Sequence, residues 1–228
     1  MAYELFTRNT PRIRGVLFDM DGLVLDTEKL YCRFWREACA HFGFSMTQTQ
    51  ALRMRAANAQ LSEANLHEFL GPKADYLRIR AKRIELMDAY IEENGVELKP
   101  GIGELLDYLD AHSLPRAITS SAPPERIRAH LSRRGLDHRF NCLCSGHQVK
   151  QGKPAPDIYL YGAACLGLPP ESCLALEDAP TGIASAFRAG CHPILIPDQD
   201  TPGREVLRKC FAKADSLADI IDLLEYLR

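Results

Sequence analysis

The sequence predicts an α/β protein built on a doubly wound parallel sheet, with a second, all-helical domain inserted into it. Short apolar runs typical of strands alternate with amphipathic helical patterns over most of the chain. One long stretch, residues 28–94, has helical patterns and no convincing strand. The 228 residues, 46% of them hydrophobic, are enough to bury one large core or two modest ones. Strand–helix alternation favours a parallel sheet with helices on both faces.

Five strands are expected, each a short apolar run bounded by turn residues or by a helical pattern. Their ranges are 13–18, 116–119, 141–144, 173–176 and 193–196. The helices between and after them carry apolar residues at helical spacing on one face. These stripes are Leu105, Leu106 and Leu109; Ile127 and Leu131; Tyr161, Ala164 and Cys165; Ile183, Ala186 and Phe187; and Leu217, Ile220, Ile221 and Leu224.

The inserted helical block begins soon after the first strand. Leu30, Phe34, Ala38 and Phe42 repeat every four residues, and a longer apolar stripe runs over 77–91. We therefore expect a sheet domain made of residues 1–27 and 95–228. A helical domain of residues 28–94 should lie over the carboxyl edge of its sheet.

Composition excludes several classes of protein. The formal net charge is −2, with 28 basic and 30 acidic side chains, so a nucleic-acid partner is not expected. No apolar run approaches the ~20 residues of a membrane helix, and residues 1–12 lack the apolar centre of a signal peptide. The eight cysteines are scattered and form no zinc pattern, so we expect free thiols in a reducing cytoplasm. A monomer is the expected state.

Polar residues follow four of the expected elements at the point where each one ends. In a parallel sheet these ends meet at one edge, where ligands bind. The residues are Asp19 and Asp21 after the first strand; Thr119, Ser120 and Ser121 after the second; Lys153 in a Gly-Lys-Pro loop after the third; and Glu177 and Asp178 after the fourth.

Carboxylates, hydroxyls and a lysine at one edge suit phosphoryl transfer. Mg²⁺ takes carboxylate and carbonyl oxygens, phosphate takes a lysine, a hydroxyl and backbone N–H groups, and a carboxylate can attack phosphorus. Each residue also has a plainer interpretation. An aspartate after a strand is often a turn former or helix cap, and Thr119–Ser121 could cap the next helix. In the helical block, Arg53 and Arg55 could contact a substrate anion, but a solvated helix face is the favoured interpretation.

Together these motifs resemble those of the haloacid dehalogenase-like hydrolases, in the family's order. The matching segments are Phe18-Asp19-Met20-Asp21-Gly22, Ile118-Thr119-Ser120-Ser121, Gly152-Lys153-Pro154 and Glu177-Asp178-Ala179-Pro180-Thr181-Gly182. The resemblance covers residues 13 to about 196 and implies a Rossmann-like core with a helical cap. Asp26-Thr27-Glu28, followed by Arg33-Phe34-Trp35, is similar to the subgroup of β-phosphoglucomutase and small-substrate phosphatases.

The resemblance implies a role for each residue. Asp19 would be the nucleophile, and Asp21 the general acid and base. The metal would be Mg²⁺, held by the Asp19 carboxylate, the Asp21 backbone carbonyl and Asp178, with Glu177 as a further ligand or a hydrogen-bonded neighbour of one. The Thr119 hydroxyl, the Ser120 N–H and Lys153 would bind the phosphoryl group. The cap would open and close on hinges near 26–27 and 94–101.

The implied function is a Mg²⁺-dependent phosphatase for a small phosphorylated metabolite. A phosphomutase of the β-phosphoglucomutase type is the alternative. Tyr31 stands where that enzyme has histidine, and residues 51–61 lack its Gly-x-Ser-Arg pattern, which argues against the mutase. Asp21 argues against a carbon–halogen hydrolase, because those members lack the second carboxylate. The intact set of Asp19, Asp21, Lys153 and Asp178 argues against a binding protein without activity.

Overall fold

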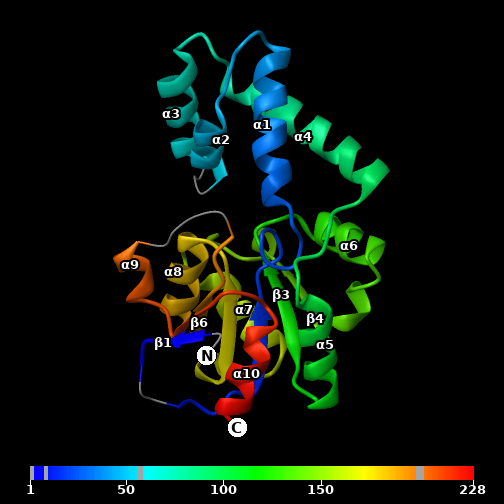
Figure 1. Cartoon of the computed structure of the whole chain (residues 1–228), viewed down its shortest axis with the longest axis vertical. Coiled ribbons are helices and arrows are strands. Elements are labelled where there is room, and N and C mark those ends of the chain that lie inside the picture. The colour runs from blue at the N-terminus through cyan, green and yellow to red at the C-terminus, as the bar shows by residue number, and fades with distance from the viewer. Residues whose placement is uncertain (1–2, 8–9, 56–58, 199–202) are drawn as a thin grey trace. The chain divides into compact units, whose positions relative to one another are not determined.

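The structure is a computed structural model that describes the chain except for residues 1–2, 8–9, 56–58 and 199–202, together with the side chains of 55, 59 and 60. It divides into two compact units. The first joins Met1–Leu25 to Leu98–Arg228 and contains the sheet, and the second is Asp26–Glu97 (Figure 1).

The sheet of the first unit has seven strands among the described residues, in the order β1-β7-β6-β5-β2-β3-β4. All neighbours are parallel except β1 and β7. The strands are β1 (Tyr3–Leu5), β2 (Gly15–Phe18), β3 (Arg116–Ser120), β4 (Cys142–Ser145), β5 (Cys173–Glu177), β6 (His192–Leu195) and β7 (Ala212–Ala214). After β4 the chain crosses to the other side of β2, so the strand order reverses between β2 and β5. The carboxyl ends of these two strands form the crevice where open α/β sheets bind ligands.

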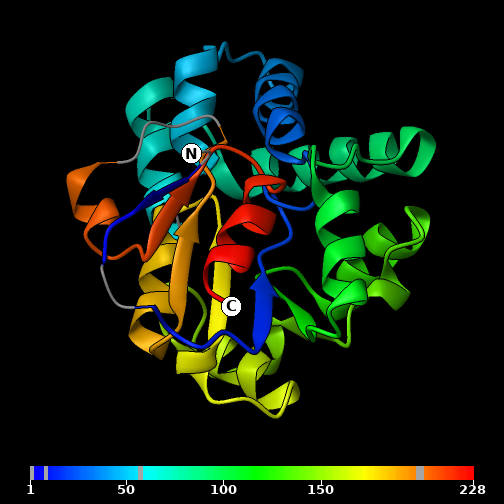
Figure 2. The same cartoon turned by 60° about the horizontal axis from the view of Figure 1, so that its bottom comes forward.

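Helices cover both faces of the sheet, as a doubly wound fold requires. They are α5 (Ile102–Ala111), α6 (Pro124–Arg133), α7 (Asp157–Cys165), α8 (Pro180–Ala189), α9 (Arg204–Leu207) and α10 (Asp219–Tyr226), with 3₁₀ turns at Asp137–Arg139, Gly146–Gln148 and Pro170–Ser172. α7 packs on β2, β3 and β4, and α8 packs on β5 and β6. α5 and α10 pack together on the opposite face (Figure 2).

Side-chain alternation along the strands assigns residues to these two faces. Leu17, Ala117 and Ala175 join Ile158 and Tyr159 of α7 in one buried cluster. The odd-numbered residues of β2, β3 and β5 therefore face α7, and these include Thr119 on β3 and Glu177 on β5. Their neighbours of the other parity, such as Phe18 and Ser120, point to the opposite face.

The second unit is all helical over its described residues. Its helices are α1 (Glu28–His41), α2 (Gln48–Arg55), α3 (Ala59–Leu70) and α4 (Tyr76–Asn94). Trp35 of α1 stacks on Tyr76 of α4, with ring centroids 6.2 Å apart, so it belongs to the core of this unit. Asp75 caps α4 by accepting a hydrogen bond from the Arg78 N–H.

The five expected strands are confirmed, each within two residues of its predicted ends. β1 and β7 were missed, because strands of three residues at a sheet edge are too short to show alternation. All eight cysteines are free thiols, and six of them are buried. None of the helices in the described ranges is long and apolar enough to cross a membrane.

Candidate active site

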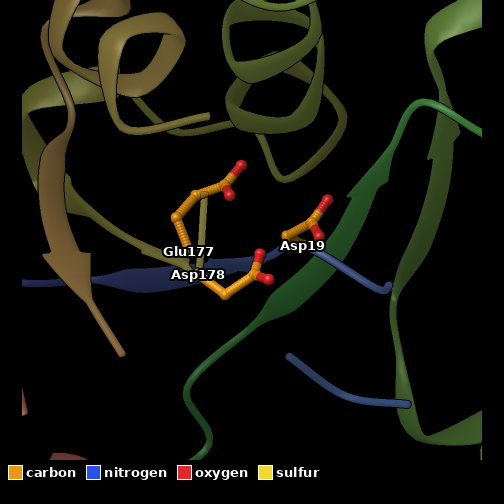
Figure 3. Close-up of side chains that lie close together, drawn as sticks. All are labelled: Asp19, Glu177 and Asp178. Carbon is orange, nitrogen blue, oxygen red and sulfur yellow. The ribbon is translucent and has the colours of Figure 1, made fainter. Parts of the chain in front are cut away.

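Three carboxylates meet in the crevice between β2 and β5. Asp19 follows the last residue of β2, Glu177 ends β5, and Asp178 comes next (Figure 3). β2 and β5 are paired so that Phe18 lies opposite Leu176, and the Asp19 N–H donates to the Leu176 carbonyl at 3.0 Å. One carboxylate oxygen from each residue lies within 4.8 Å of the other two. Such a group of hard oxygen ligands fits a small divalent cation such as Mg²⁺ after a modest adjustment of side chains.

Lys153 joins two of these carboxylates. Its Nζ donates to Asp19 Oδ1 and to Glu177 Oε1, each at 2.6 Å, and its side chain is 9% exposed. Burial lowers the pKa of Lys153, but the negative charges of Asp19 and Glu177 outweigh it, and the pKa is raised. The lysine is therefore a fixed cation at neutral pH. When all three carboxylates are ionised, they exceed this one ammonium by two charges, which is the charge of one Mg²⁺.

Glu177 is the most enclosed of the three carboxylates, at 1% exposure. Besides Lys153 it accepts a hydrogen bond from the Tyr159 hydroxyl of α7, at 2.5 Å to the same Oε1. Burial raises the pKa of Glu177, Lys153 lowers it and Asp19 raises it again, and the net shift is upward. Tyr159 was not among the predicted site residues. It lies among apolar residues of α7, and nothing in the local sequence pattern distinguishes it from an ordinary core residue.

Gly182, in the first turn of α8, makes room for the Glu177 carboxylate. A methyl group added there would lie 1.8 Å from Oε1 and 2.1 Å from Oε2. A flexible carboxylate could move aside at little cost, but this one is held by Lys153 and Tyr159. Glycine at this position is therefore required by the site and not by the helix.

We predict that Gly182→Ala lowers the free energy of unfolding by about 1–3 kcal/mol, because Glu177 must leave buried donors to make room. Urea denaturation measures this. Gly103→Ala is the matched control, since Gly103 lies in α5 with nothing within 4 Å of the added methyl group. It should gain up to about 1 kcal/mol from helix propensity. A Gly182→Ala protein that gains stability like the control contradicts the prediction.

The hydroxyl cluster after β3 is divided between two environments. Thr119 is fully buried on the α7 face, where its Oγ1 donates to the Phe18 carbonyl at 3.2 Å. Its Cγ2 is so close to α7 that a methyl group on Gly162 would lie 2.6 Å from it. Ser120 faces the other side at the end of the strand, and its Oγ accepts from the Ala122 N–H at 3.1 Å. The hydroxyls of Thr119 and Ser120 therefore each have a backbone partner in the structure.

Asp21 lies in the tight turn after β2. It forms an isolated bridge with Leu25, and the Gly22 N–H donates to the Leu25 carbonyl at 2.9 Å. Gly22 has φ +87°, a conformation that favours glycine. The Asp21 carboxylate is outside the acidic group of Asp19, Glu177 and Asp178. Its predicted contact with a metal was through the backbone carbonyl.

Arg53 of the helical unit is paired with a neighbouring carboxylate on the surface. Its guanidinium donates to both carboxylate oxygens of Glu68 at 3.0 Å and lies over the Phe69 ring, and half of the side chain is exposed. This agrees with a solvated helix face. The side chain of Arg55, the other arginine considered, lies outside the described residues.

Comparisons with known proteins identify the family of the chain. The family model of the haloacid dehalogenase-like hydrolases matches residues 16–196. Hexitol phosphatase A of Escherichia coli is 33% identical over 193 residues, which cover 84% of this chain and 87% of that protein. A phosphorylated carbohydrates phosphatase of Thermotoga maritima is 30% identical, over 80% and 84% of the two chains.

A solved structure shares the fold. The haloacid dehalogenase family hydrolase of Deinococcus radiodurans, determined with bound phosphate and sodium, superposes with a TM-score of 0.78 at 27% identity. The match covers 96% of this chain and 97% of that one. The family model spans Asp19, Lys153 and Asp178, and the chain belongs to the haloacid dehalogenase-like hydrolases.

Proposed function

We propose that the chain is a Mg²⁺-dependent phosphoric monoester hydrolase acting on a small phosphorylated carbohydrate. The observation that carries this proposal is the Lys153 ammonium, 2.6 Å from Asp19, beside three carboxylates in the crevice of the sheet. The substrate class rests on the hexitol phosphatase and the carbohydrate phosphatase among the relatives.

The reaction proceeds in two displacements at phosphorus. The Asp19 carboxylate attacks, the ester P–O bond breaks, and Asp21 gives its proton to the departing alcohol oxygen. Asp21 then takes a proton from water, which attacks the aspartyl-phosphate and releases inorganic phosphate. The Asp19 carboxylate is regenerated, so all atoms and protons are accounted for.

The attack on phosphorus requires that the negative charges of the site be balanced. A phosphomonoester dianion would be repelled by Asp19, Glu177 and Asp178 together. Mg²⁺ held by these carboxylates and the Asp21 carbonyl would neutralise their excess charge and polarise a phosphoryl oxygen. Lys153 stabilises both the nucleophile and the phosphoryl oxygens. Ser120 supplies its hydroxyl and N–H to the phosphoryl group, whereas Thr119, engaged with Phe18, shapes the end of β3.

We predict that the purified chain with Mg²⁺ releases phosphate from members of a panel of hexitol, hexose, pentose and glycerol phosphates, phosphoglycolate and nucleotides. Excess EDTA should abolish release, and added Mg²⁺ should restore it. An assay for inorganic phosphate measures both. If no member of the panel is hydrolysed above the rate of a boiled sample, the proposed function is wrong. Conversion of β-glucose 1-phosphate to glucose 6-phosphate without phosphate release would establish the mutase instead.

A further inference from the structure

Tyr159 brings a hydroxyl group into the most enclosed part of the site. It is fully buried and is among the largest side chains with this burial. Its hydroxyl lies 2.5 Å from Glu177 Oε1, and the Lys153 ammonium lies 5.3 Å from the centre of its ring. A carboxylate oxygen can only accept, so the hydroxyl is the donor in this hydrogen bond.

The ring alone is explained by packing, because it belongs to the cluster that joins α7 to the sheet. Phenylalanine would fill the same space without a polar atom to satisfy. The hydroxyl needs its own explanation, since a buried donor is tolerated only with a partner. It donates to the carboxylate that also holds Lys153, and the Thr119 side chain is a second hydrogen-bonding neighbour.

The surroundings of Glu177 restrict it from three directions. Lys153 and Tyr159 both donate to Oε1, and α8 presents Gly182 against the carboxylate. Two donors on one oxygen restrict the rotation of the carboxylate, and one of them, Lys153, also donates to Asp19. Without the tyrosine donor, the position of Glu177 would depend on Lys153 alone.

We propose that Tyr159 is a positioning residue: its hydroxyl orients Glu177, and through Glu177 it sets the place of Lys153 beside Asp19 and the affinity of the acidic group for a divalent cation. The expected effect of Tyr159 on kcat rests on the proposed function. Its expected effect on Mg²⁺ binding does not. Tyr159 touches neither phosphate nor water in this scheme.

The test compares Tyr159→Phe with Tyr161→Phe in the full chain. Tyr161 lies on the same helix, and its hydroxyl interacts with the Cys165 thiol and not with Glu177. Titration calorimetry with Mg²⁺ alone should show at least threefold weaker binding for Tyr159→Phe and unchanged binding for Tyr161→Phe. Thermal melting checks that both variants fold. Binding by Tyr159→Phe within twofold of wild type, or tighter, overturns the proposal.

Kinetics separate positioning from packing. Tyr159→Phe should lower kcat about tenfold and change KM less than threefold, because the substrate does not touch it. In a Glu177→Gln background the same substitution should change kcat less than twofold, since the residue it acts through is already altered. An equal loss in both backgrounds overturns the proposal. If the wild-type chain hydrolyses no phosphomonoester, the proposed function fails, and Mg²⁺ binding still decides the role of Tyr159.

Discussion

Asp19→Asn is expected to lower kcat for phosphate release by at least about 10³-fold while the protein stays folded. The amide has the same shape as the carboxylate and keeps an oxygen that can accept from Lys153 Nζ. It is not a nucleophile toward phosphorus, however, so the first displacement stops. It also removes one of the three negative charges grouped for a cation. Both effects act on the chemical step, so the loss should appear in kcat and only modestly in KM.

Steady-state assays at saturating Mg²⁺ measure this loss, and circular dichroism checks the fold. Asp107→Asn is the matched control, because this exposed aspartate of α5 pairs with Arg139 at 2.8 Å on the surface. Its kcat should stay within twofold of wild type. Acid quenching during turnover, followed by mass spectrometry, should find a phosphoryl group on the peptide containing Asp19 in the wild-type chain. Turnover by Asp19→Asn within tenfold of wild type would exclude Asp19 as the nucleophile.

The convergence of Asp19, Lys153, Glu177 and Asp178 could be predicted from the sequence, because parallel pairing alone brings the ends of such strands to one edge. The loop with Lys153 precedes α7, and α7 returns the chain from β4 to β5 beside β2. The order of the motifs along the chain therefore decides their meeting place. No knowledge of side-chain packing is needed for that step.

The choice between neighbouring hydroxyls could not be predicted in the same way. Thr119 and Ser120 differ only in the face of β3 to which they point, and that face depends on which helix covers it. The sequence shows that hydroxyl residues end this strand, but it does not show which of them point toward α7. Packing of Thr119 against Gly162 and its bond to Phe18 place its side chain on the α7 face, whereas Ser120 points to the other face.

Tyr159 and Gly182 escaped prediction for a related reason. Tyr159 lies in a helix among apolar neighbours and has the pattern of an ordinary core residue. Gly182 lies in the first turn of α8, where a glycine is unremarkable. Their roles follow from the position of the Glu177 carboxylate, which is set by three contacts from α7, the Lys153 loop and α8. Such contacts between segments have no signal in local sequence periodicity.

Lys153→Met is expected to damage both stability and activity, because the lysine is the sole counter-charge that the structure shows between Asp19 and Glu177. Methionine keeps the length of the side chain but leaves two buried carboxylates facing each other. Removing one partner of a buried ion pair costs about 3–5 kcal/mol in the free energy of unfolding. Loss of a donor to the phosphoryl group should lower kcat a further ~10²–10³-fold.

Urea denaturation and steady-state kinetics measure the two effects of Lys153→Met. Lys213→Met is the control, since Lys213 pairs with Asp215 at 3.0 Å on the surface, and its loss should change stability by less than about 1 kcal/mol. Mg²⁺ should raise the melting temperature of Lys153→Met more than that of the wild type, because the cation replaces the missing positive charge among the same carboxylates. A variant as stable as the Lys213 control would show that Asp19 and Glu177 do not repel each other in the folded chain. The electrostatic basis for Mg²⁺ in the proposed reaction would then be lost.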